Sequence, residues 1–152
     1  MVALPVLPAR DADVVVAVAG DVGETIGWPE LVRSVADVAR HTPGASGPVI
    51  LTSNYGEAGA IDRFGPGLGL PHAYSGHNAY GDWGPPPDGA TPVIAVGFDQ
   101  AYVARKLRGC VLAARVENDA GIDNDEAGAA VFRCQGPRTS WSREWPALRH
   151  LG

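Results

Sequence analysis

The stretch Pro48-Val49-Ile50-Leu51-Thr52-Ser53-Asn54-Tyr55-Gly56-Glu57 decides the fold class of this chain. Its first half is a short apolar, β-branched run, which predicts a buried strand over 48–52. Asn54 is followed three residues later by Glu57, the spacing of a capping box at a helix N-terminus. We therefore expect a strand, a tight turn and a helix to about Phe64, with the helix N-terminus at the carboxyl edge of a sheet, the usual ligand side.

The flanking segments continue this alternation of strands and helices. Apolar residues at helical spacing follow Trp28, with Pro29 in the first turn, and Pro43-Gly44 ends that helix. Asp99 is a candidate N-cap for a helix over 100–107. Further expected strands are 13–19, 92–98, 110–117 and 129–134, with one short strand, 73–75, inside a long structured loop over 68–88, and 141–146 lies in a packed terminal segment. The pattern predicts an α/β fold, a layered αβα sandwich with a largely parallel central sheet and an antiparallel C-terminal hairpin.

Size and charge limit the function classes. A chain of 152 residues suits one domain. The net charge of −5 and the scattered Lys and Arg argue against nucleic acid as a partner. The longest apolar run, Val14 to Ala19, is far too short to cross a bilayer, and the N-terminus does not resemble a signal peptide. Cys110 and Cys134 form either one disulfide or two buried thiols, and the residues alone leave both open.

Candidate ligand-binding residues gather in two short segments. These are Asn54, Tyr55 and Glu57, and His77, Asn78, Tyr80 and Trp83. Aromatic rings can stack on the apolar face of a sugar, and amide and imidazole groups can hydrogen-bond its hydroxyls. Each residue also has a structural interpretation: Glu57 as a helix cap, and Tyr80 and Trp83 as a seal of the loop against the core.

The sequence contains no motif for a nucleophile or a phosphate-binding loop, so no catalytic residue and no cofactor are predicted. His72 and His77 form only an H-x4-H pair within a loop, and no metal site is predicted from it. The acidic stretch 118–126 lacks the glycine of a calcium loop and is interpreted as a solvated turn.

The specific segments, taken in order, carry a resemblance to a known family. They are Gly27-Trp28-Pro29-Glu30-Leu31, Asn54-Tyr55-Gly56-Glu57-Ala58-Gly59-Ala60, Gly69-Leu70-Pro71, Ser75-Gly76-His77-Asn78, Trp83-Gly84-Pro85-Pro86, Val96-Gly97, Asn124-Asp125-Glu126 and Trp145-Pro146. This series resembles the C-terminal extracytoplasmic region of bacterial membrane glycosyltransferases of the dolichyl-phosphate-mannose protein mannosyltransferase-like family, which are related to the aminoarabinose transferases. The resemblance covers nearly the whole chain.

The resemblance implies an accessory role. Residues 1–12 would be the linker after the last membrane helix of a parent protein, and 13–152 a single soluble α/β domain on the extracytoplasmic side. The family takes sugar from a polyprenyl-phosphate donor, and its catalytic acid lies in an early loop without a counterpart here. The domain is then expected to be inactive alone and to bind the acceptor or shape the active site. Its partners would be the membrane-embedded part of the same polypeptide and a glycan or lipid-linked sugar, and Cys110 and Cys134 would pair.

Two other functions stay open at this point. One is a small free-standing hydrolase or transferase that uses Glu57 and His77 as an acid–base pair, which requires these side chains to converge. The other is a non-catalytic interaction module whose loop over 68–88 docks on a partner or on the membrane helices of the parent. An exposed apolar patch there, without a concave pocket, would favour it.

Overall fold

A computed structural model describes residues 27–44, 47–116 and 128–152 of the chain. The helices are α3 (Trp28–Arg40), α4 (Tyr55–Phe64), α5 (Ala79–Asp82), α6 (Gln100–Lys106) and α7 (Trp141–Leu148), with a 3-10 turn, η2 (Pro66–Leu68). The strands are β1 (Val49–Thr52), β2 (Ala73–Ser75), β3 (Val93–Val96), β4 (Leu107–Arg108), β5 (Val111–Arg115), β6 (Ala130–Cys134) and β7 (Gly136–Pro137). Within the described ranges, no helix combines the length and apolar character needed to cross a membrane.

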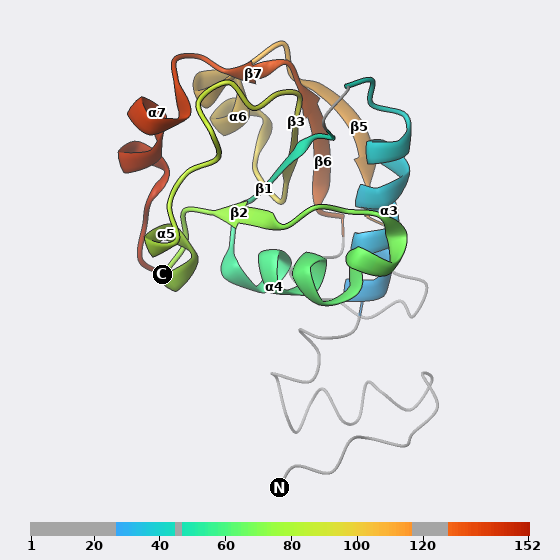
Figure 1. Cartoon of the computed structure of the whole chain (residues 1–152). Coiled ribbons are helices and arrows are strands. Elements are labelled where there is room, and N and C mark those ends of the chain that lie inside the picture. Colours follow the sequence, from blue (N-terminus) through green and yellow to red (C-terminus); the bar gives the residue numbers. More distant parts are fainter. Residues whose placement is uncertain (1–26, 45–46, 117–127) are drawn as a thin grey trace, which may run out of the picture.

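The central sheet has five strands in the order β2-β1-β3-β6-β5 (Figure 1). Strand β1 pairs in parallel with β2 and with β3, whereas β6 runs antiparallel to both β3 and β5. The sheet therefore has a parallel core that continues into an antiparallel hairpin, as the sequence predicts. Strands β4 and β7 form a separate two-stranded antiparallel sheet.

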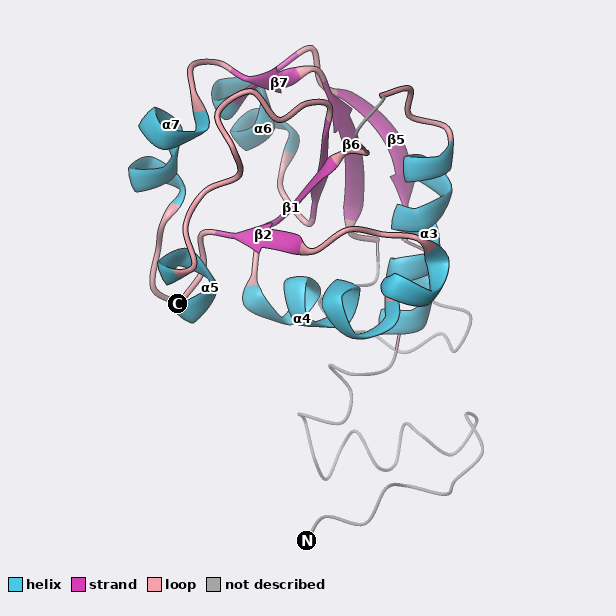
Figure 2. Cartoon of the chain, in the orientation of Figure 1, coloured by secondary structure: helices cyan, strands magenta, loops and turns pink. Residues whose placement is uncertain are grey.

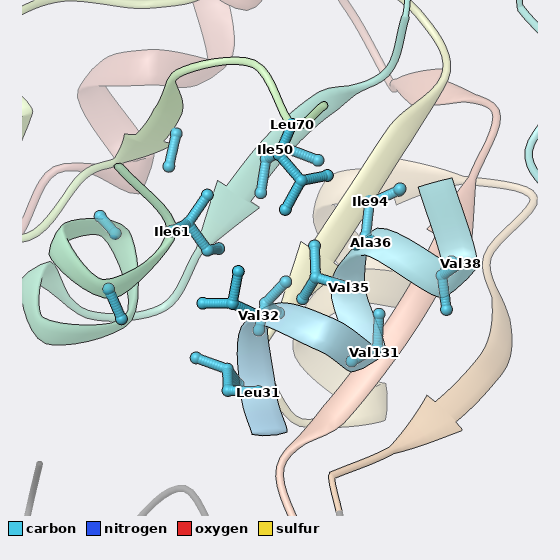
Figure 3. Packing of buried hydrophobic residues seen from close by; sticks show 14 of the residues in the cluster. Leu31, Val32, Val35, Ala36, Val38, Ile50, Ile61, Leu70, Ile94 and Val131 are labelled. Atoms are coloured by element: carbon cyan, nitrogen blue, oxygen red, sulfur yellow. The ribbon is translucent and has the colours of Figure 1, made fainter. Parts of the chain in front are cut away.

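Helices α3 and α4 cover one face of this sheet (Figure 2). Their apolar stripes meet the β-branched side chains of β1 and β3, and Figure 3 shows Val32, Val35 and Ile61 converging on Ile50 and Ile94. Gly27 precedes α3 with a positive φ, and Pro29 lies at its first turn, where a missing backbone N–H costs nothing. These contacts confirm the amphipathic helix expected after Trp28.

A second core fills the opposite face, under α6 and α7. Trp141, Trp145 and Leu148 of α7 pack there with Leu51 and Phe132 of the sheet. The indole N–H of Trp141 donates to Ala90 O at 2.9 Å, and that of Trp145 donates to Gly81 O at 3.1 Å. The tail is thus packed, as expected, and it forms a helix that the sequence pattern did not predict. Helices on both faces complete the layered α/β architecture.

Two further details differ from the expectation or lie beyond it. The loop over 68–88 contains β2 at the predicted residues, and it also contains the four-residue helix α5. The predicted strand 13–19, the linker 1–12 and the acidic stretch 118–126 lie outside the described residues.

Candidate functional site

The carboxyl ends of β1 and β3 define a point where the chain leaves the sheet in opposite directions. From β1 the chain passes through α4 to β2, and from β3 it passes through α6 toward β5. In open α/β sheets such a divergence creates a crevice that commonly binds ligands. Ser53 follows β1 and Gly97 follows β3 at this crevice, and the N-terminus of α4 begins beside them.

Glu57 fills this crevice. Its Oε2 accepts hydrogen bonds from Ser53 N and Ser53 Oγ, both at 3.0 Å, and from Asn54 N at 3.2 Å. Asn54 Oδ1 accepts in return from Glu57 N at 2.9 Å, so the capping box is complete. Only 3% of Glu57 is exposed. The structural interpretation of Glu57 as a cap is therefore confirmed.

Gly97 makes room for that carboxylate. Its φ is +79°, and a Cβ built on it would lie 1.9 Å from Glu57 Oε1. Both the backbone conformation and the available space therefore require glycine at this position. Beside it, Ser53 and His150 help to line a cavity of about 340 Å³, whose other walls include Phe98 and Tyr102 of the α6 side.

His77 and Asn78 lie under the C-terminal segment. Asn78 N donates to His150 O at 3.0 Å, His150 N donates to Gly76 O at 2.9 Å, and the rings of His77 and His150 stack 4.6 Å apart. Burial, and then the charge of His150, lower the pKa of His77. His77 Nδ1 accepts from Tyr55 N at 3.4 Å, which fixes a tautomer with the proton on Nε2. His77 thus supports the first turn of α4, where Tyr55 is exposed.

Tyr80 and Trp83 belong to a different cluster, which we call the aromatic shelf and define as His72, Tyr80 and Trp83. The ring of Trp83 lies 4.4 Å from that of Tyr80 and 6.0 Å from that of His72, measured between centroids. Asp62 of α4 connects the shelf: its Oδ2 accepts from Tyr80 Oη at 2.9 Å and lies 3.0 Å from His72 Nδ1. Trp83 is 66% exposed, so it does not seal the loop against the core.

The predicted residues therefore separate into two groups. Asn54, Tyr55, Glu57, His77 and Asn78 surround the N-terminus of α4, whereas Tyr80 and Trp83 lie on the aromatic shelf. His72 and His77, the H-x4-H pair, are in different groups, and the described residues hold no cluster of three metal-binding side chains. Sequence reasoning missed Asp62 and His150 as members of these groups. The signal available for Asp62 was a second acid in the predicted helix, five residues after Glu57.

Cys110 and Cys134 form a disulfide bond. Cys110 immediately precedes β5, and Cys134 is the last residue of β6, so the bond joins the open ends of the antiparallel hairpin. This pairing confirms the disulfide that the family resemblance implies.

Compared with known proteins, the chain matches no family model, no curated protein and no solved structure.

Proposed function

We propose that this domain is an extracytoplasmic accessory part of a membrane glycosyltransferase that takes sugar from a polyprenyl-phosphate donor. In this role the domain binds the acceptor or shapes the entrance to an active site located elsewhere in the parent polypeptide. The proposal starts from the sequence resemblance over Asn54–Ala60 and Ser75–Asn78. In this proposal, the membrane-embedded part of the parent polypeptide forms the glycosidic bond.

The commitment of Glu57 to the fold is the observation that carries the non-catalytic assignment. A general acid or base must reach the proton that it transfers. Glu57 is 3% exposed and holds Ser53 and Asn54 through its Oε2, so it stabilises the turn between β1 and α4. His77 is engaged separately, with Tyr55 N and the ring of His150. These contacts favour an accessory domain over an enzyme built on Glu57 and His77.

The disulfide supports the proposed compartment. Disulfides persist in oxidising surroundings, such as the outer side of a bacterial membrane, and are rare in the cytosol. The Cys110–Cys134 bond closes the hairpin of β5 and β6, which also forms one edge of the main sheet. An extracytoplasmic position would keep this bond oxidised.

The first test is enzymatic. Purified 1–152 is incubated with a polyprenyl-phosphate-linked hexose and a glycan acceptor, and both transfer and hydrolysis are followed by mass spectrometry. We expect no turnover. Turnover that disappears in both Glu57→Gln and His77→Gln, while both variants remain folded, would replace the proposal with a free-standing enzyme.

The second test concerns the parent. The reading frame upstream of Met1 should encode several apolar segments of about 20 residues each. In the membrane protein so identified, deletion of this domain should lower transfer to the acceptor. An upstream frame without such segments, or a parent whose transfer is unaffected by the deletion, would contradict the accessory role.

A docking role is the second candidate, and one observation favours it. Leu68 and Trp83, which lie near the two ends of the loop over 68–88, are both exposed. Exposed apolar side chains of this kind can pack against a partner surface. In that case the partner would be the membrane-embedded part of the same polypeptide.

A further inference from the structure

We propose that the aromatic shelf, together with Asp62, is a binding site for one neutral pyranose ring. This inference deepens the proposed function, on which it rests for the source of the sugar, because it assigns the acceptor glycan rather than the phosphate-linked donor to this surface. The shelf lies at the open edge of the sheet. His72 immediately precedes the edge strand β2, Tyr80 lies on α5, Trp83 follows α5, and Asp62 comes from α4.

The apolar half of the site is the indole of Trp83. It is 66% exposed, and the ring of Tyr80 lies beside it at 4.4 Å. One face of a pyranose presents mainly C–H groups, which pack on an aromatic ring and remove both surfaces from water. His72 also lines an adjoining cavity of about 350 Å³ with Tyr74 and Pro87, which gives room beyond a single ring.

The polar half of the site offers acceptors. Asp62 accepts from Ala73 N at 2.8 Å and from Tyr80 Oη at 2.9 Å, and it lies 3.0 Å from His72 Nδ1. Since the Tyr80 proton points to Asp62, the lone pairs of that phenol oxygen remain as acceptors. Because Nδ1 of His72 lies at Asp62, its other ring nitrogen, Nε2, adds a further polar group to the site.

An acceptor-rich site beside a carboxylate selects its ligand by charge. Sugar hydroxyls donate hydrogen bonds to such groups, whereas a phosphate or carboxylate needs donors or cations. Burial and the neighbouring Asp62 raise the pKa of Tyr80 to about 12, so its hydroxyl stays protonated at neutral pH. The shelf is therefore matched to a neutral pyranose and mismatched to a sugar phosphate.

The shelf is also held in place before any ligand arrives. The buried Trp145 donates from Nε1 to Gly81 O at 3.1 Å, which fixes α5 to α7. Arg149 pairs with Asp82, the next residue of α5, and the C-terminus lies beside α5 in Figure 1. A rigid platform loses less conformational freedom on binding, which favours recognition of a small ligand.

The test is an NMR titration of isotopically labelled 1–152. The neutral probes are the methyl α-glycosides of mannose, glucose and galactose, and the anionic probe is glucose 1-phosphate. We expect at least one neutral glycoside to bind with a Kd of about 1 mM, typical of a single small ring, and to shift the Trp83 indole N–H and the Tyr80 amide. Glucose 1-phosphate should bind at least fivefold more weakly than methyl α-glucoside.

Three variants locate the site. Trp83→Ala should weaken binding at least tenfold, followed at the Tyr80 amide, and Tyr80→Phe should weaken it several-fold. Phe64→Ala is the matched control, because Phe64 is an exposed aromatic at the end of α4, is 43% exposed and lies outside the shelf. It should leave the affinity unchanged. Both Trp83→Ala and Phe64→Ala alter exposed side chains, so each should unfold like the wild type.

Each alternative result is decisive. Tighter binding of glucose 1-phosphate than of the neutral glycosides, or shifts that avoid Trp83, would overturn the pyranose site. Shifts at Trp83 caused by phospholipid vesicles but by none of the sugars would replace it with a docking surface. If none of the sugars binds, the pyranose site is overturned, but the accessory role is not contradicted. If the domain binds a sugar and also turns over the donor, the accessory role is contradicted, but the pyranose site on the aromatic shelf is supported.

Discussion

Glu57 and Asp62 lie on the same helix, α4, but their carboxylates have different roles. Glu57, in the first turn of α4, accepts three hydrogen bonds from the neighbouring residues Ser53 and Asn54 and is 3% exposed. The side chain of Asp62, further along α4, is 23% exposed and joins residues of other elements, His72 and Tyr80. A carboxylate that accepts hydrogen bonds at the N-terminus of its own helix stabilises the fold. A carboxylate that contacts aromatic side chains from other elements can hold them in position for a ligand. Burial and the origin of the partners distinguish the two roles.

The largest expected effect is the loss of the buried carboxylate. Glu57→Ala removes three hydrogen bonds to Ser53 and Asn54 and should lower the free energy of unfolding by about 3–4 kcal/mol. Glu57→Gln keeps one oxygen acceptor and should cost about half of that. Urea denaturation measures both. A Glu57→Ala variant as stable as the wild type would contradict the role of Glu57 in stabilising the fold.

Removal of the disulfide should destabilise the domain without changing the contacts of the Glu57 and Asp62 carboxylates. Cys110→Ser with Cys134→Ser opens a loop of sequence separation 24, which the chain-entropy model values at about 3.5 kcal/mol. Urea denaturation of the double variant, and of the wild type under reducing conditions, should give the same loss. Methyl glycosides should still shift Trp83 in the oxidised and reduced forms. A loss of sugar binding here would show that binding follows stability rather than the shelf.

Asp62→Asn should have a small effect on stability and a clear effect on the shelf. Because Asp62 is partly exposed, we expect the free energy of unfolding to fall by about 1 kcal/mol or less. The pKa of Tyr80 should fall only part of the way from about 12 toward 10, because the negative charge of Asp62 disappears while burial, the largest cause of the shift, remains. A tyrosine titration by NMR measures this. An unchanged Tyr80 pKa would contradict the contact between the two side chains.

The smallest effect concerns pH and the N-terminal end of α4. The pKa of His77 is lowered by burial and then by His150, so the unfolded chain binds more protons as the pH falls below about 6.5. The contribution of His77 to stability is therefore complete above that pH and is lost as the pH falls through its folded pKa. Protonation also removes the acceptor for Tyr55 N.

Two measurements follow this change. Protection of the amides of Tyr55 and Asn78 against hydrogen exchange, relative to their intrinsic exchange rates at each pH, should decrease from pH 7.5 to pH 5. His150→Gln should raise the pKa of His77 only in part, because burial is the larger cause. A full return to the ordinary histidine pKa in this variant would assign the shift to charge alone.

Local patterns were sufficient for most of the fold. The capping box at Asn54, the apolar stripe after Trp28 and the Asp99 cap each depend on residues a few positions apart, and the structure contains all three. Helix α5 was missed because four residues are too few to show a helical period. Helix α7 was missed because Pro146 lies inside it and weakens the pattern.

The aromatic shelf, and the packing of the C-terminal segment on His77 and Asn78, depend on contacts that no local pattern contains. Asp62 reaches Tyr80 from 18 positions away, and Gly152 N donates to Asn78 Oδ1 from 74 positions away. Such pairs become neighbours only after β2 aligns with β1 and the C-terminal segment pairs, through His150, with the residues that follow β2. The sequence therefore indicated Tyr80 and Trp83 as members of a site, but the acid that unites them required the structure.

The bond between Cys110 and Cys134 turns the hairpin of β5 and β6 into a covalent ring. A protease that cuts the chain once at any peptide bond between these two cysteines leaves both fragments attached through sulfur. The cleaved domain would migrate as one species on a non-reducing gel and as two after treatment with a thiol. Damage to the segment between the two strands would thus separate neither strand from the molecule.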